Sequence, residues 1–372
     1  MKVYPLFILL ICVLFAGANP PEVSETDQTI IFHIFNGEYQ SADSLLEAQI
    51  KLQPNHPKYY ALKSHSAFYA RYFDNTGMDR DSLLQLVLDY AQKAIDVSEN
   101  LEETTDVKFY LSVAHGYKSR VYGIQRELYD AYWAARKGRN YSKDVIEKDP
   151  EYYDAYVGLA VLDYFNATRI TGWRRSLAWI LGMSGDREKA LEYFNLVEEK
   201  GSLFKPEAKF INAMMYRFLE TDLERAVPYF ENFIAQYPNN AFMQNQYRTL
   251  QLNQLIQDKG VEYLAANIDS LRTEYNINNA NVLNAIGYGF VNNEDYETAV
   301  AVFQLNVELY PDVANCYDSL GEGYLLSGNN EEAIKNYQIA FEKLDTDTTL
   351  NEDFREVLRE SIDTHLQELN AL

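Results

Sequence analysis

Two stretches near the C-terminal end of the chain decide the fold. Residues 280–311 read ANVLNAIGYGFVNNEDYETAVAVFQLNVELYP, and residues 314–345 read ANCYDSLGEGYLLSGNNEEAIKNYQIAFEKLD. A shift of 34 residues places the first stretch on the second, so that Leu283, Ile286, Gly287, Phe290, Ala299, Phe303, Asn306 and Pro311 fall on Tyr317, Leu320, Gly321, Tyr324, Ala333, Tyr337, Ala340 and Asp345. A period of about 20 to 50 residues indicates a repeat architecture.

The residue types in this pattern suit pairs of packed helices. Gly287 and Gly321 have no side chain, and Ala299 and Ala333 have small ones, which allows two helices to approach closely. The aromatic residues of the pattern fill the space around these contacts. Pro311 ends the second helix of its unit.

The pattern resembles the tetratricopeptide repeat (TPR) family, in which a large residue, Leu-Gly and an aromatic residue occupy one helix and Ala, an aromatic residue and Ala occupy the next. The resemblance is specific over 278–345, weaker over 185–277 and weakest over 28–166. The chain also resembles, more loosely, exported or envelope-associated TPR proteins in which an aromatic insert precedes a helix that starts with Gly-Asp-Arg, here at 185–187. Such a scaffold implies a binding surface rather than a particular chemistry.

Weaker copies of the second-helix pattern occur upstream. They are Ala226 to Pro238, 241–277 with Ala265 in the small-residue position, Gly185 to Val197, and Gly37 to Pro54. Extra residues interrupt the spacing at 69–83, 116–150 and 166–185. The spacing predicts roughly seven helix pairs with insertions.

The sequence therefore predicts an all-α fold, and the resemblance implies a right-handed α-solenoid of helix-turn-helix repeats. No segment shows the apolar alternation of strands. Residues 351–372 read as one amphipathic capping helix, whose apolar positions are Phe354, Val357, Leu358, Ile362, Leu366 and Leu369.

The first 18 residues read as a signal peptide. Lys2 precedes an apolar run over 6–16, and Ala16-Gly17-Ala18 supplies a cleavage site, so we expect export to the periplasm, cell envelope or extracellular space. A linker over 19–27 and a solenoid over 28–372 complete the expected organisation. Two alternatives are an uncleaved anchor and a lipidated Cys12, although the bulky Ile11 precedes that cysteine.

The charge of the chain limits its partners. The 372 residues include 55 Asp and Glu against 33 Lys and Arg, for a net charge of -22. This balance weighs against nucleic acid and anionic lipid and favours a neutral to basic partner. After cleavage only Cys316 remains, so no internal disulfide is expected.

Catalytic patterns are missing from the sequence. The histidines form no His-Glu-x-x-His pair, and neither a Gly-x-Ser-x-Gly elbow nor a phosphate-binding glycine-rich loop occurs. We therefore expect a protein that is not an enzyme and uses no cofactor. An unrecognised hydrolase, with histidines or acid pairs as catalytic groups, is the alternative.

One segment resembles a calcium loop. Asp345, Asp347, Thr349, Asn351, Asp353 and Glu356 have the alternate spacing of an EF-hand, but Leu350 stands where that loop needs Gly. The interpretation we favour is a polar linker that caps the last helix, with no metal. Calcium binding by Asp345–Glu356 remains the alternative.

The segment Trp173–Leu181 has the most unusual composition, with two Trp, two Arg and an aliphatic run. The favoured interpretation places its Trp residues inside the chain's own groove, because large exposed apolar patches are uncommon on soluble monomers. The alternative is a membrane-surface envelope protein that acts through this insert.

The resemblance implies that the first helix of each pair lines a concave face. The ligand-binding candidates on that face and in the insert are Asn281, Asn284, Tyr288, Asn292, Asn315, Asp318, Glu322, Trp173 and Trp179. TPR proteins that grip a peptide carboxylate use Lys and Arg at such positions, and this chain lacks them. We therefore expect a scaffold or adaptor that binds a protein or peptide of neutral to basic character, with a solvated face that binds nothing as the alternative. The sequence does not specify an oligomeric state.

Overall fold

The computed structural model describes residues 23–73, 78–172, 182 and 184–370. Within these ranges the regular structure is helical and includes no strand, which confirms the all-α prediction. The chain divides into two compact units after Phe242. The signal peptide predicted over 1–18 and the candidates Trp173 and Trp179 lie outside the described residues.

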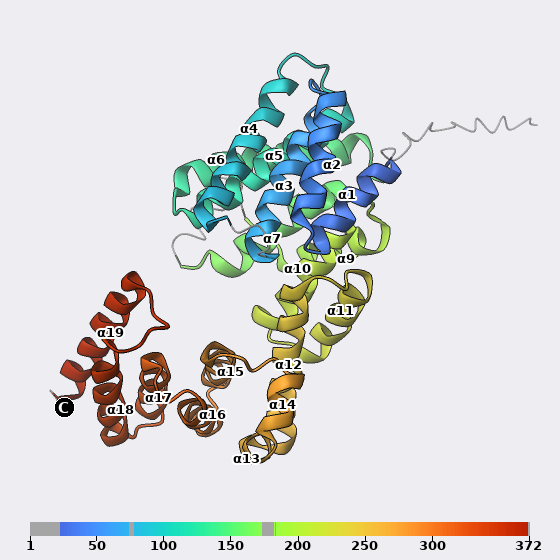
Figure 1. Cartoon of the computed structure of the whole chain (residues 1–372). Coiled ribbons are helices and arrows are strands. Elements are labelled where there is room, and N and C mark those ends of the chain that lie inside the picture. The colour runs from blue at the N-terminus through green and yellow to red at the C-terminus, as the bar shows by residue number, and fades with distance from the viewer. Residues whose placement is uncertain (1–22, 74–77, 173–181, 183, 371–372) are drawn as a thin grey trace, which may run out of the picture. The chain divides into compact units, whose positions relative to one another are not determined.

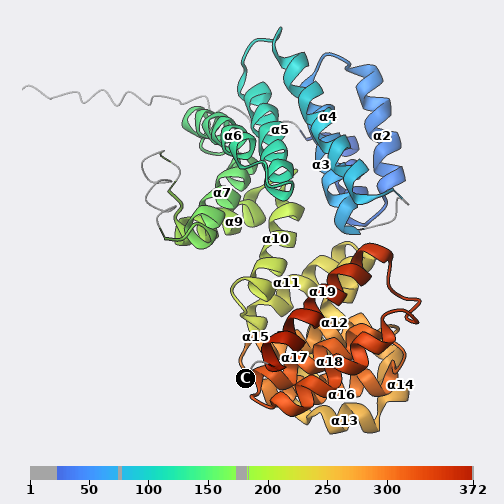
Figure 2. The same ribbon diagram turned by 90° about the vertical axis from the view of Figure 1, so that its left-hand side faces the viewer.

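The described residues of the first unit form ten α-helices, and Figure 1 shows their arrangement. Their bounds are α1 Glu25–Phe35, α2 Tyr39–Leu52, α3 Pro57–Phe73, α4 Arg80–Ser98, α5 Thr105–Ile124, α6 Leu128–Lys148, α7 Tyr156–Arg169, α9 Arg187–Lys200, α10 Lys205–Phe218 and α11 Leu223–Gln236, with a 3-10 turn at Tyr153–Ala155. Consecutive helices pack against each other, and Figure 2 shows α2 to α6 as a row of neighbours.

The small and aromatic positions predicted upstream lie in the helix contacts. Ala42 and Leu46 on α2 are fully buried, and so are Ala226, Phe230 and Phe233 on α11. On α9, the side chains of Ala190, Phe194 and Val197 are at most 1% exposed. The extra residues at 116–150 lengthen the helices instead of the loops, because α5 and α6 have 20 and 21 residues against 14 in α9 and α11.

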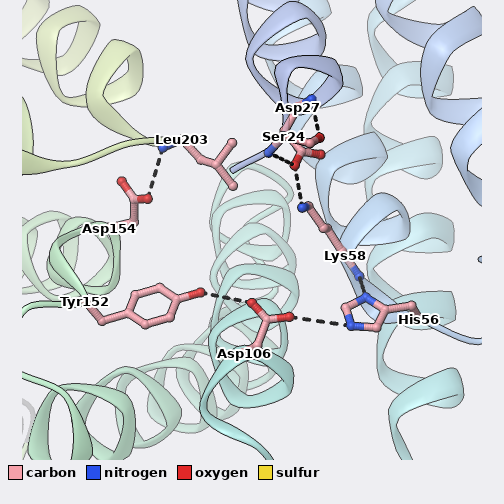
Figure 3. A network of polar contacts seen from close by, with 8 residues as sticks. All are labelled: Ser24, Asp27, His56, Lys58, Asp106, Tyr152, Asp154 and Leu203. Atoms are coloured by element: carbon pink, nitrogen blue, oxygen red, sulfur yellow. Dashed lines mark hydrogen bonds and ion pairs between the residues drawn. The ribbon is translucent and has the colours of Figure 1, made fainter. Parts of the chain in front are cut away.

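Buried carboxylates fix the ends of several helices in the first unit (Figure 3). Asp27 and Ser24 form a capping box at the start of α1, and Lys58 on α3 pairs with Asp27 at 2.6 Å. Asp154 accepts the backbone N–H groups of Ser202, Leu203 and Phe204, directly before α10. The capping box explains why α1 begins at Glu25, inside the stretch 19–27 that the sequence assigns to a linker.

The second unit holds the two clearest repeats. Its helices are α12 Ala241–Lys259, α13 Val261–Ala266, α14 Ile268–Glu274, α15 Ala280–Asn292, α16 Tyr296–Leu309, α17 Ala314–Leu326, α18 Asn330–Lys343 and α19 Glu352–Asn370, and α12 starts two residues before the division. A Cβ on Gly287 would overlap the ring of Phe303, and one on Gly321 would lie 2.9 Å from Cδ1 of Tyr337. The glycines therefore mark close helix contacts, as the repeat predicts.

Helix pairs of this kind recur through the described residues. The pairs are α1 with α2, α3 with α4, α5 with α6, α7 with α9, α10 with α11, α15 with α16, and α17 with α18, which makes seven. The fold is thus a TPR-like array of helix pairs. The segment 241–277 departs from it, because its second helix is broken at Asn267 into α13 and α14.

Two details of the sequence interpretation are wrong. Ala265 is exposed and Leu264 is fully buried, so the small-residue position assigned to 241–277 is out of register. On α19, Leu358, Ile362 and Leu369 are buried against α18, but Phe354 is 44% exposed and Val357 is 61% exposed. The helix caps the last pair through a narrower apolar stripe than predicted.

Within the described residues, no helix combines the length and hydrophobicity that a membrane span requires.

Candidate functional site

The second unit brings five polar side chains together from three helices. Tyr288 comes from α15, Asp318, Ser319 and Glu322 come from α17, and Tyr337 comes from α18; we call them the Asp318 cluster. Asp318 and Glu322 are four residues apart on α17 and therefore share one face of that helix. The hydroxyl of Tyr288 donates to Oε2 of Glu322 at 2.6 Å and lies 3.3 Å from Oγ of Ser319.

Asp318 is the unusual member of the cluster. Its residue is 8% exposed, and its Oδ1 atom has no hydrogen-bond partner in the described part of the chain. Burial raises the pKa of Asp318, and the neighbouring charge of Glu322 raises it further, to about 7. An unpaired carboxylate oxygen in such a position favours a hydrogen-bond donor or a cation as its partner.

Tyr337 lies close enough to the two carboxylates to feel their charges. Its ring packs against Gly321, and its hydroxyl is buried without a hydrogen-bond partner among the described residues. Burial raises the pKa of Tyr337, and the charges of Asp318 and Glu322 add to this effect, so the hydroxyl stays protonated at neutral pH. The cluster thus offers acceptors on the carboxylates and a neutral hydroxyl that can donate or accept.

The other candidates on α15 and α17 do not join the cluster. Asn281 and Asn292 are exposed at the two ends of α15, and Asn315 is half-buried in the first turn of α17. Asn284 is half-buried and its Oδ1 has no partner in the described residues. Of the seven predicted positions in the second unit, the structure brings together Tyr288, Asp318 and Glu322.

Sequence reasoning missed Ser319 and Tyr337. Tyr337 occupies the aromatic position of the repeat and was assigned only to packing. The repeat pattern could have indicated the position of Tyr337, because the aromatic residue at this place packs on Gly321, which follows Asp318 by three residues. The hydroxyl of Tyr337 therefore lies near Asp318 and Glu322, which are on the same helix as that glycine.

A second polar group is buried in the first unit. Glu207 on α10 is fully buried, pairs with Nη2 of Arg120 on α5 at 2.8 Å, and accepts from the Tyr117 hydroxyl at 2.8 Å. His65 on α3 lies 3.6 Å from the same carboxylate. Burial acts to raise the pKa of Glu207, but the charges of Arg120 and His65 and the hydrogen bonds from Tyr117 and Arg120 together outweigh it, so the net shift is downward.

This buried group gives the hydrolase alternative no support. His65 is fully buried, and its ring is stacked against Tyr117 and Phe204 at 5.4 and 5.2 Å. Burial lowers the pKa of His65 to about 4, so the ring is neutral at pH 7. A substrate cannot reach a histidine enclosed in this way, and a general base must contact the proton that it removes.

The calcium-like segment has structural roles. Asp347 accepts the backbone N–H of Ala314 at 2.8 Å and both the N–H and the hydroxyl of Thr349, while Asp345 pairs with Arg359 at 2.7 Å. Asn351 accepts the N–H of Phe354 in the first turn of α19. These side chains connect α17 and α19 to the linker that joins α18 to α19. Across the described ranges, no group of three or more His, Cys, Asp or Glu side chains is arranged to hold a metal ion.

Comparison with known proteins adds distant likenesses. No family model matches the chain, and no curated protein matches it. Among solved structures, a tetratricopeptide repeat protein from Parabacteroides merdae is 14% identical, with 91% of this chain and 99% of that chain covered and a TM-score of 0.29. The TPR domain of P58(IPK) is 15% identical over 93% and 98%, with a TM-score of 0.21, and yeast Tom70 is 12% identical over 93% and 88%, with a TM-score of 0.27. With scores this low, the fold assignment rests on the helix contacts of this chain.

Proposed function

We propose that this protein is a non-enzymatic scaffold that binds a neutral to basic segment of a partner protein through the Asp318 cluster. The observation that carries the proposal is a pair of carboxylates on one face of α17, where the half-buried Glu322 lies beside Asp318, whose buried Oδ1 atom has no hydrogen-bond partner among the described residues. A lysine ammonium, an arginine guanidinium or an exposed backbone N–H supplies the donor that this oxygen lacks. A TPR-like array presents such a face on rigid helices, which limits the entropy lost on binding.

Charge supports a basic partner. The net charge of -22 creates a negative field around the chain, and the two carboxylates of the cluster add to it locally. Acidic segments are repelled by the same field. Because exposed charges are screened over about 8 Å at physiological salt, we expect the affinity for a basic peptide to fall as the salt concentration rises.

The test compares a lysine-rich and a glutamate-rich peptide of equal length, titrated into the full chain at low and high salt. The variant is Asp318→Asn with Glu322→Gln, which keeps the shape of both side chains, the buried one and the half-buried one. The matched control is Glu297→Gln with Glu308→Gln, which removes the same charge from exposed positions of α16. We expect the cluster variant to lose most of the preference for the basic peptide and the control to keep it. If both variants lost the preference for the basic peptide to the same extent, the preference would come from net charge and not from the Asp318 cluster.

Export belongs to the same proposal. It rests on the sequence of residues 1–18, with Lys2, the apolar run over 6–16 and Ala16-Gly17-Ala18. The intact mass of the protein purified from cells that export it gives a direct test. We expect a mass that starts at Asn19, whereas a mass that retains residues 1–18 or carries a lipid on Cys12 would contradict this processing.

A further inference from the structure

A pocket of about 250 Å³ opens in the first unit, whereas the Asp318 cluster belongs to the second. Its walls come from α3, α5, α7, α9 and α10 and are mainly aromatic, with Phe68, Tyr69, Tyr164, Phe165, Phe194 and Phe210 among the lining residues. Phe165 is 55% exposed and Leu219 is 44% exposed, although both line the pocket. Large apolar side chains on the rim of an open pocket favour an apolar ligand.

The size of the pocket limits that ligand. An apolar cavity of about 150 Å³ in another protein holds benzene, which has six carbon atoms. In proportion, a pocket of 250 Å³ accepts an apolar body of about eight to ten carbon atoms, either a chain or two fused rings.

The charged residues of the lining are arginines. Arg120 and Arg169 line the pocket, and among the described residues no Asp or Glu does. Arg120 is already neutralised by the buried Glu207, and its guanidinium lies 4.6 Å from the Tyr117 ring centre, so it forms a fixed wall. Arg169 is exposed, and no ion pair joins it to a described residue. In a chain of net charge -22, an unpaired arginine at an apolar pocket is complementary to an anion.

We propose that this pocket binds a small monocarboxylic acid of about eight to ten carbon atoms. Its apolar body packs among Phe68, Phe194 and Phe210, and the carboxylate pairs with Arg169 at the rim. This site is separate from the Asp318 cluster and does not depend on the function proposed there. It gives the protein a small-molecule ligand besides its protein partner.

The test uses three probes of one chain length and different head groups, which are octanoate, octanol and octylamine. Each is titrated calorimetrically into the full chain. We expect octanoate to bind more tightly than octanol, and octylamine to bind most weakly, at least about fivefold below octanoate. Equal binding of octanoate and octylamine, or no binding of octanoate, would overturn the proposal.

Variants locate the ligand. Arg169→Gln changes an exposed side chain and should weaken octanoate about two- to fivefold while leaving octanol unchanged. Arg80→Gln, at an exposed position of α4, is the matched control and should leave both unchanged. Val161→Trp fills the pocket and should abolish binding of octanoate and octanol at an unchanged melting temperature.

Two results contradict this assignment. The first is an equal loss of octanoate affinity in the Arg169 and Arg80 variants, which would reduce the effect to overall charge. The second is binding of a blocked apolar peptide, N-acetyl-phenylalanyl-leucinamide, without binding of octanoate, which would assign the pocket to a peptide partner.

Discussion

Single buried charges distinguish the two units of this protein. In the first unit Glu207 is compensated by Arg120, with further contacts from Tyr117 and His65. In the second unit Asp318 has an acidic neighbour and an unpaired oxygen. The buried carboxylate of the first unit is compensated by a cation. The buried carboxylate of the second unit has no cation beside it among the described residues.

The unpaired state of Asp318 predicts a pH-dependent stability. The pKa of its carboxyl rises from the ordinary 3.8 to about 7, so the folded chain binds a proton that the unfolded chain has released between these values. The free energy of unfolding therefore falls as the pH rises from 4 to 7. Tyr288 on α15 and Tyr337 on α18 face the same carboxyl and stay protonated in this range.

Asp318→Asn removes this titration. We expect the stability of the variant relative to the wild type to increase by about 1–3 kcal/mol between pH 5 and pH 8. Urea unfolding of both proteins at the two pH values measures the difference. A stability difference that is the same at pH 5 and pH 8 would show that Asp318 titrates normally.

The compensated charge predicts a large loss of stability when one partner is removed. Glu207→Gln leaves the guanidinium of Arg120 without its buried counter-ion, which should cost about 3–5 kcal/mol. Glu332→Gln removes an exposed partner of Lys335 and should cost far less. Equilibrium unfolding of the two variants checks the contrast, and similar costs would mean that Arg120 finds another partner.

At the scale of the element, a helix pair depends on one close approach. Gly287 faces the ring of Phe303, whereas Gly289 on the same helix would place a Cβ 3.4 Å from Nδ2 of Asn253, at ordinary contact distance. Both glycines lower the helix propensity of α15 equally. Only the first is required by packing.

This contrast gives a prediction within one helix. Gly287→Ala should destabilise the second unit by about 1–3 kcal/mol, because the methyl group forces α15 away from α16. Gly289→Ala should be neutral or stabilise it by up to about 1 kcal/mol through helix propensity. Thermal unfolding of the two variants measures both effects, and a stabilising Gly287→Ala would disprove the close contact.

The capping helix α19 offers a second pair of variants. Ile362 is fully buried against α18, so Ile362→Ala should cost about 2–5 kcal/mol. Val357 is 61% exposed, and Val357→Ala should change stability by no more than about 0.5 kcal/mol. Denaturant unfolding of both variants is the check. If Val357→Ala cost as much as Ile362→Ala, the wider stripe predicted from the sequence would be right after all.

At the scale of the whole molecule, the sequence predicts the helix contacts that recur from one repeat to the next. The spacing of glycine, alanine and aromatic residues by 34 positions is enough to place the contacts of α15 to α18, because each contact lies within or between adjacent pairs. Two features depend on neighbouring helices. They are the break at Asn267 between α13 and α14, and the choice of which residues of α19 are buried. The spacing of apolar residues within one helix does not specify either feature.

The polar sites are less predictable because they combine distant residues. Tyr117 and Glu207 are 90 residues apart, and no local pattern joins them. Asp318 and Glu322 could be placed on one face from their spacing, but the depth of Asp318 depends on α15 and α18 packing around α17. Asp318, which the sequence places on the concave face, is thus buried, and its test substitution is therefore Asn, which keeps the size of the side chain.

The ionisation of Asp318 in the presence of a basic peptide tests the central claim most directly. Carbon NMR of the labelled carboxyl reports its pKa in the free and the peptide-bound chain. We predict a pKa of about 7 in the free chain. When the lysine-rich peptide binds, the pKa should fall by at least about one unit, because a nearby cation favours the charged carboxylate. A pKa that stays the same when the peptide is bound would contradict the claim that Asp318 receives the basic partner.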